Sequence, residues 1–135
     1  MAEALDSPLL QDVEQIALTV QDLPRAKAFY RDALGMRFLF DAGSMAFFEC
    51  GSVRLMIGQG EPPSSPGGTI IYFRVADINA AAQLLQSRGV EFVQQPHLVA
   101  RMKTHDLWLA FVKDTSGNTL GLMCEMTRPN EKTED

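Results

Sequence analysis

The pattern of apolar and polar positions predicts a strand followed by a helix near the start of the chain. Residues 15–20 alternate between apolar and polar or small side chains, which is the period of a strand with one buried face. Over residues 26–34 apolar side chains recur at the spacing of one helix face. Asp22 suits the N-cap of this helix, because a carboxylate accepts orphan backbone N–H groups, and Gly35 suits a left-handed C-cap.

The same pattern returns in the second half of the chain. Asp22 corresponds to Asp77 at a separation of 77 − 22 = 55, and Gly35 corresponds to Gly89 at 89 − 35 = 54. The repeat predicts an α+β fold of tandem βαβββ modules, with two curved mixed sheets around a cleft and helices on the outer faces. The three strands expected after each helix are residues 36–40, 44–49 and 53–58 in the first half and residues 90–94, 107–113 and 119–125 in the second.

The segments between these elements set the expected boundaries of the modules. We expect the first module at residues 12–58 and the second at residues 69–126. A linker rich in proline and glycine joins them at residues 59–68, and residues 127–135 form a flexible polar tail. Residues 95–105 are expected to form a loop, which is the kind of segment that often carries functional side chains.

Composition and charge narrow the class of partner. The chain has 135 residues, of which 46% are hydrophobic, so it can bury one core without a metal or disulfide staple. A net charge of −5 and the lack of a basic run argue against nucleic acid and anionic membranes as partners. Only two cysteines are present, and we find no signal-peptide pattern or membrane-spanning apolar stretch, so we expect a cytoplasmic protein.

Two segments carry a resemblance to a known family. Residues 20–35 (VQDLPRAKAFYRDALG) resemble the opening signature of the vicinal oxygen chelate superfamily, and residues 110–118 (AFVKDTSGN) resemble its late turn, with Thr115 in place of a proline. This superfamily includes glyoxalase I, methylmalonyl-CoA epimerase, extradiol dioxygenases, fosfomycin-modifying enzymes and bleomycin-resistance proteins. The resemblance implies the same tandem fold and, for a chain of this length, a homodimer. It does not identify a reaction, because one fold hosts many activities.

The resemblance also implies four metal-binding positions, one on each of four strands. Carried over to this chain, they fall on Gln15, Leu55, Ile70 and Gly121. Only Gln15 offers a donor atom, whereas a divalent ion needs three or more N, O or S donors. We therefore predict that the usual metal centre is absent and that the protein uses no cofactor.

Strand alternation predicts which side chains line the cleft. Arg74 either clamps a carboxylate or phosphate of a ligand or pairs with an acid at a dimer interface. His97 and His105, the only histidines, either serve as a general base or have a structural role. Trp108 lies near them in sequence and either contacts the ligand or packs in the core. The expected ligand-binding residues are Gln15, Thr19, Leu55, Ile70, Tyr72, Arg74, Trp108, Gly121 and Met123.

These expectations give a leading function and two alternatives. The leading interpretation is a glyoxalase-like protein that has lost the metal ligands and binds a small organic ligand, anionic or aromatic, between the sheets. The first alternative is a metal-dependent lyase or isomerase of glyoxalase, epimerase or dioxygenase type, with ligands such as the two histidines and a glutamate. The second is a metal-independent enzyme in which Arg74 or Tyr72 holds an anion and a histidine moves a proton. The sequence leaves open whether the protein is an enzyme.

Overall fold

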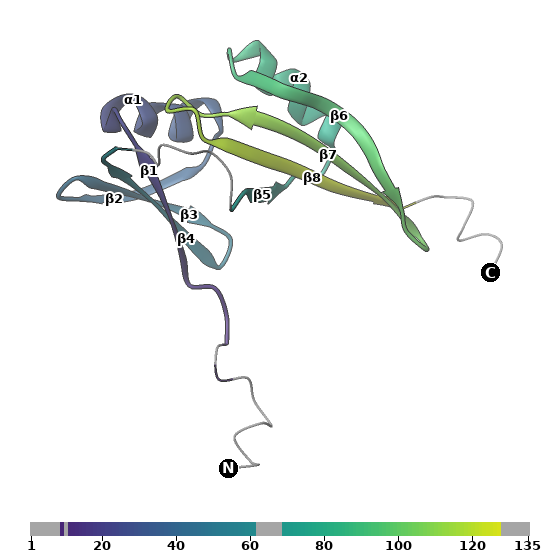
Figure 1. Ribbon diagram of the computed structural model, residues 1–135, viewed down its shortest axis with the longest axis horizontal. Helices are drawn as coiled ribbons and strands as arrows, with labels where there is room; N and C mark the ends of the chain where they lie inside the picture. The colour runs from purple at the N-terminus through teal and green to yellow at the C-terminus, as the bar shows by residue number, and fades with distance from the viewer. Residues whose placement is uncertain (1–8, 10, 62–68, 128–135) are drawn as a thin grey trace.

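Two modules with the same order of elements make up the fold (Figure 1), which the computed structural model describes over residues 9, 11–61 and 69–127. The predicted βαβββ repeat is confirmed. The first module consists of β1 (Gln15–Val20), α1 (Leu23–Ala28), a short π-helix η2 (Phe29–Ala33), β2 (Arg37–Ala42), β3 (Met45–Cys50) and β4 (Val53–Gln59). The second consists of β5 (Ile71–Arg74), α2 (Ile78–Ser87), β6 (Glu91–Arg101), β7 (His105–Lys113) and β8 (Thr119–Thr127).

Both modules build the same mixed sheet. The strand order is β1-β4-β3-β2 in the first sheet and β5-β8-β7-β6 in the second. In each sheet the first and last strands of the module pair in parallel, and the remaining pairs are antiparallel. The two sheets remain separate rather than closing into one barrel.

The helices begin and end where the sequence predicts. The carboxylates of Asp22 and Asp77 both accept hydrogen bonds from backbone N–H groups of the first turn. Gly35 and Gly89 both adopt the left-handed conformation, with φ of 73° and 83°, which a residue with a Cβ rarely adopts. From cap to glycine the first helix spans 35 − 22 = 13 positions and the second 89 − 77 = 12. The wider π-turn of η2 absorbs the additional residue.

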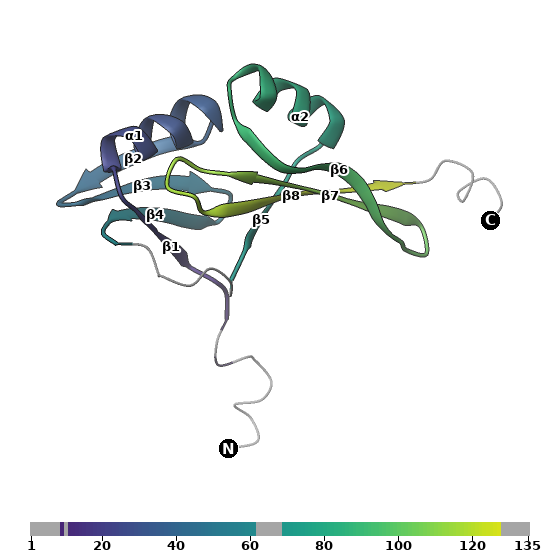
Figure 2. The same cartoon turned by 45° about the horizontal axis from the view of Figure 1, so that its top comes forward.

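A single hydrophobic core joins the helix-covered faces of the two sheets. The helices α1 and α2 lie side by side on the same side of the sheets (Figure 2). Tyr30 and Phe48 from the first module are buried in one cluster with Val112 and Leu120 from the second. The opposite face of each sheet carries no helix within the described residues (Figures 1 and 2), and we call these two surfaces the helix-free faces.

A buried carboxylate fastens the modules to each other. Asp114, which is 6% exposed, accepts a hydrogen bond of 2.8 Å from the Tyr30 hydroxyl across the module boundary. Its other hydrogen bonds come from the backbone N–H groups of Ser116 and Asn118 and from the Asn118 amide. The Asn118 amide also donates to the carbonyl oxygen of Thr19 at 3.0 Å. The turn before β8 is therefore bonded to both β1 and η2 of the first module.

The expectation of a loop at residues 95–105 is wrong for most of that segment. β6 extends to Arg101 and β7 begins at His105, so only residues 102–104 form the connection. Register shifts between β6 and β7 absorb the irregular residues, and Pro96 is tolerated because β6 is an edge strand that needs no donor on its open side.

The module boundaries stay a prediction, because part of the junction is not described. Residue 59 belongs to β4, whereas residues 62–68 of the expected linker and residues 128–135 of the expected tail lie outside the described residues. In the part of the chain that is described, no helix is long and apolar enough to span a bilayer.

The Tyr30 hydroxyl gives a prediction for alkaline pH. Burial, followed by the neighbouring Asp114 carboxylate, raises the pKa of Tyr30 well above its ordinary value of 10.0. Because the folded pKa is raised, the contribution of Tyr30 is fully present below pH 10.0 and declines above it, where the unfolded chain ionises first. We expect the free energy of unfolding to fall there by up to about 1.4 kcal/mol per pH unit from this group alone.

Urea unfolding of the wild type and Tyr30→Phe between pH 8 and pH 11 measures this dependence. Below pH 10 the variant should be less stable by about 1–3 kcal/mol, because a hydrogen bond to a charged acceptor is lost. Above pH 10 the difference should shrink, since phenylalanine does not ionise. A difference that stays constant across the whole range would contradict the assignment.

Candidate functional site

The helix-free face of the first sheet can be followed row by row from the strand register, since paired residues point to the same side. One row carries charged and polar side chains, and the next is apolar. Arg54 Nε donates to Gln15 Oε1 at 2.8 Å, and its guanidinium carbon lies 5.3 Å from the centre of the Phe47 ring. Phe47 in turn stacks on Phe40 with ring centres 4.6 Å apart. The charged and polar row consists of Arg37, Glu49, Arg54 and Gln15. The apolar row consists of Phe40, Phe47, Met56 and Ala17.

The helix-free face of the second sheet has an aromatic row beside a row with two basic groups. Tyr72 contacts Phe111 edge to face at 5.8 Å between ring centres. Its ring also lies directly on Gly121, where an added Cβ would meet a ring carbon at 2.5 Å. The Tyr72 ring therefore fills the space that any side chain at position 121 would need. The aromatic row consists of Tyr72, Gly121, Phe111 and Gln94. The row with two basic groups consists of Arg74, Met123, Leu109 and His97.

The two histidines lie apart along the second sheet. His97 is half-buried and its Nδ1 lies 2.8 Å from the carbonyl oxygen of Gln95. A carbonyl only accepts, so the Nδ1 of His97 donates this hydrogen bond. His105 begins β7 opposite Thr127 in the register, and its Nδ1 contacts the Thr104 hydroxyl at 2.7 Å. Only His97 therefore shares a row with Arg74.

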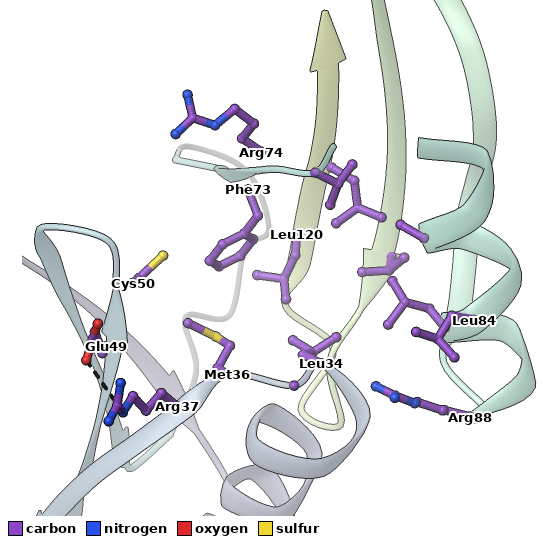
Figure 3. A pocket seen from close by; sticks show the side chains of 16 residues that line it. Leu34, Met36, Arg37, Glu49, Cys50, Phe73, Arg74, Leu84, Arg88 and Leu120 are labelled. Atoms are coloured by element: carbon purple, nitrogen blue, oxygen red, sulfur yellow. Dashed lines mark ion pairs between the residues drawn. The ribbon is translucent and has the colours of Figure 1, made fainter. Parts of the chain in front are cut away.

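Arg74 borders three cavities. It is exposed, and its side chain has no hydrogen-bond or ion-pair partner among the described residues. One cavity, of about 370 Å³, lies between the modules and is lined mainly by apolar side chains such as Phe73 and Leu120 (Figure 3). A second, of about 320 Å³, lies between the β3–β4 hairpin and Tyr72. The third cavity, of about 380 Å³, lies along residues 123–125 of β8 and is also lined by His105.

Two of the expected ligand-binding residues lie on the core side: the expectation for Leu55 is wrong, whereas Trp108 follows the alternative in which it packs in the core. Leu55 is 2% exposed and points to the core, because it pairs with Ile16 in the register. The two-residue turn after β3 pairs Cys50 with Val53 and so fixes which residues of β4 face the core. Trp108 is also on the helix-covered side, where it packs against the core cluster.

The other expected residues lie on the side of the sheets away from the core. Their role in ligand binding stays a prediction. They are Gln15, Thr19, Tyr72, Arg74, Gly121 and Met123, while Ile70 precedes β5 and is exposed.

The sequence analysis missed three residues of the helix-free faces. Arg54, Met56 and Phe111 are absent from the expected ligand-binding residues, because Leu55 was taken as the residue of β4 that faces the cleft. The signal that could have found them is the short Gly51–Ser52 turn, which makes the β3–β4 register calculable from the hairpin itself.

Comparison with known proteins identifies the family. A model for the Glyoxalase/Bleomycin resistance protein/Dioxygenase superfamily matches residues 12–122. The chain belongs to this superfamily. Among curated proteins, an uncharacterized protein of Mycolicibacterium smegmatis is 26% identical over 110 residues, which cover 81% of this chain and 90% of the relative.

Solved structures of the superfamily share the fold. A member from Sphaerobacter thermophilus has 24% identity and a TM-score of 0.71, with 87% of this chain and 100% of that chain covered. The fosfomycin resistance protein FosX from Listeria monocytogenes has 15% identity and a TM-score of 0.72, with 92% and 99% covered. A lactoylglutathione lyase from Agrobacterium tumefaciens has 19% identity and a TM-score of 0.68, with 85% and 94% covered. At these identities the likeness shows the fold alone.

The side chains at the superfamily's metal-binding positions do not fit a divalent ion. The resemblance implies positions at Gln15, Leu55, Ile70 and Gly121, and because Leu55 faces the core, its neighbour Met56 is the residue of β4 on the same face as Gln15. The oxygen of Gln15 already accepts a hydrogen bond from the cationic Arg54. The other three offer at most a thioether, which is a poor ligand for the hard or borderline metals of such sites. Nor does the described part of the chain contain a group of three His, Cys, Asp or Glu side chains that could hold an ion.

The contact between Tyr72 and Gly121 gives a prediction. Gly121→Ala should lower the free energy of unfolding by about 1–3 kcal/mol, because the Tyr72 ring must leave its position. In a Tyr72→Ala background the same substitution should be nearly neutral. Gly58→Ala is the matched control, since its Cβ would meet only ordinary contacts at 3.7 Å. Equal losses for Gly121→Ala in both backgrounds, measured by urea unfolding, would show that the ring does not occupy this space.

Proposed function

We propose that the protein is a metal-independent, small-molecule-binding member of the superfamily, with its ligand on the helix-free faces of the sheets. The observation that carries this proposal is the Tyr72 ring lying on Gly121, in the space of a family metal ligand. In the first module, the Arg54 guanidinium on Gln15 supports the same conclusion, because a fixed positive charge disfavours a cation beside it.

The lining of the helix-free faces supports an organic ligand with aromatic or anionic character. Apolar floors with a few polar groups are typical of small-molecule sites. Here the floor consists of side chains such as Phe40, Phe47 and Phe111, and the charged groups beside it include Arg54 and Arg74. The acidic net charge of −5 gives no support to nucleic acid as an alternative partner.

We also infer that two copies of the chain pair through the helix-free faces of their second sheets. On this face the edge strand β5 presents Tyr72, which is 45% exposed, beside Phe111. Members of this superfamily of similar length pair as homodimers, and a second copy would cover these side chains. Cys50 and Cys124 are both free thiols, which supports a reducing compartment such as the cytoplasm.

One observation favours a second candidate function, a metal-independent enzyme. Arg74 and His105 line the same cavity of about 380 Å³. This pair is suited to removing a proton from an anionic substrate, with the histidine as general base and the arginine as anion binder. Turnover that His105→Gln abolishes while ligand affinity is kept would favour this candidate.

Metal analysis and ligand screening test the main proposal together. Protein purified without chelators should contain far less than one Zn, Ni, Fe or Mn per chain. A compound that raises the melting temperature should do so equally with and without EDTA, because binding stabilises the folded state without an ion. A stoichiometric metal that ligand binding requires would overturn the proposal.

The dimer gives a separate prediction. The wild type should sediment as a dimer, and Tyr72→Glu should shift it to a monomer, because a charge would be buried against the second copy. Leu84→Glu is the control, since Leu84 is a similarly exposed apolar residue on α2, on the helix-covered side. Dissociation by Leu84→Glu but not by Tyr72→Glu would place the interface on the helices instead.

A further inference from the structure

Arg54 is held in position by two contacts within its own sheet. Its Nε donates to Gln15 Oε1 at 2.8 Å, and its guanidinium lies over the Phe47 ring at 5.3 Å. The hydrogen bond holds the Nε end of the guanidinium in place, and the contact with the Phe47 ring restricts the orientation of the guanidinium plane. A side chain ordered in this way loses less conformational entropy when it binds a ligand than a free arginine does.

The outer edge of this guanidinium remains open. A guanidinium has five N–H donors, and only the Nε donor of Arg54 has a partner among the described residues. Glu49 is the cross-strand neighbour of Arg54, yet its carboxylate pairs with Arg37 Nε at 3.8 Å, as the dashed line in Figure 3 marks. The fork formed by Nη1 and Nη2 is therefore available to an acceptor from outside the chain.

We propose that Arg54 binds the carboxylate of an aromatic carboxylic acid whose ring lies against Phe40. This inference rests on the proposed function and goes beyond it by naming the ligand class and the residue that recognises it. The planar fork matches a carboxylate with two parallel hydrogen bonds. The adjoining row supplies a stacked aromatic pair, and Phe40 is exposed enough to receive a ring.

Glu49 favours a carboxylate over a phosphate at this position. Its carboxylate stands next to Arg54 in the same row and is 47% exposed. A ligand with two negative charges would meet stronger repulsion from Glu49 than a singly charged carboxylate would. Arg74 lies on the other sheet and has no partner that fixes its guanidinium, so it offers a less ordered fork.

Binding of 3-phenylpropanoate and of its neutral amide, measured by calorimetry, tests the proposal. The wild type should prefer the carboxylate by roughly 10–100-fold, the value of hydrogen bonds to a charged group. Arg54→Gln should abolish this preference and leave the affinity for the amide unchanged. Arg54→Lys should keep only part of it, because an ammonium is a point charge without the fork. Glu49→Gln should strengthen carboxylate binding.

Arg88→Gln is the matched control for general electrostatics, because Arg88 is an exposed arginine that caps α2 and donates to Ala33. It should keep the full preference, and each variant should remain folded at the temperature of the measurement, as a cooperative unfolding transition in urea would show. A preference that survives Arg54→Gln but is lost in Arg74→Gln would overturn the assignment, as would tighter binding of phenyl phosphate.

The two proposals fail in different ways. If the amide and the carboxylate bind equally well without metal, the assignment of Arg54 is wrong while the small-molecule site stands. If neither aryl compound binds and the protein holds a stoichiometric metal ion, both proposals are wrong.

Discussion

The structure depends on the buried Asp114 carboxylate at the junction of the two modules. A charged group in this position costs several kcal/mol unless every oxygen is satisfied, so its donors must keep their geometry. Tyr30 supplies one donor from the first module, and the turn that contains Asn118 supplies the rest. Because Asn118 also bonds the backbone of β1, the junction fixes the helix-covered sides of both sheets against one core.

Joining the modules in this way determines which surfaces remain for a ligand. The core uses every second residue of each strand, and the residues between them are left on the helix-free face. β4 shows the division, since Leu55 and Ile57 are buried whereas Arg54 and Met56 point away from the core. The strands that stabilise the fold therefore also carry the proposed binding groups, and a shift of one residue would exchange the two roles.

Local signals made the fold predictable from the sequence, and non-local pairing limited the prediction of the site. The caps at Asp22 and Asp77 and the glycine stops are set by residues within one helix, so their repeat identified both modules. The face of Leu55 depends on the register that the β3–β4 hairpin imposes, and the path of β6 depends on bulges against β7. Neither is visible in the alternation of a single strand. The alternatives for Trp108 stayed open for the same reason, because its face follows from pairing with β8.

The two halves of the proposed site differ from the superfamily's metal centre in complementary ways. Tyr72 corresponds to Ala17 at 72 − 17 = 55, and each is paired with the ligand position of the neighbouring strand, Gly121 or Met56. In the second module the first strand carries the large side chain, Tyr72, and the last strand carries Gly121. In the first module the first strand carries the small Ala17, and the last strand carries Met56. A metal donor at position 121 would have to displace the Tyr72 ring, and one beside Gln15 would have to tolerate the charge of Arg54. Under the proposed metal-independent function, side chains in both modules would therefore have to change before a metal ion could bind.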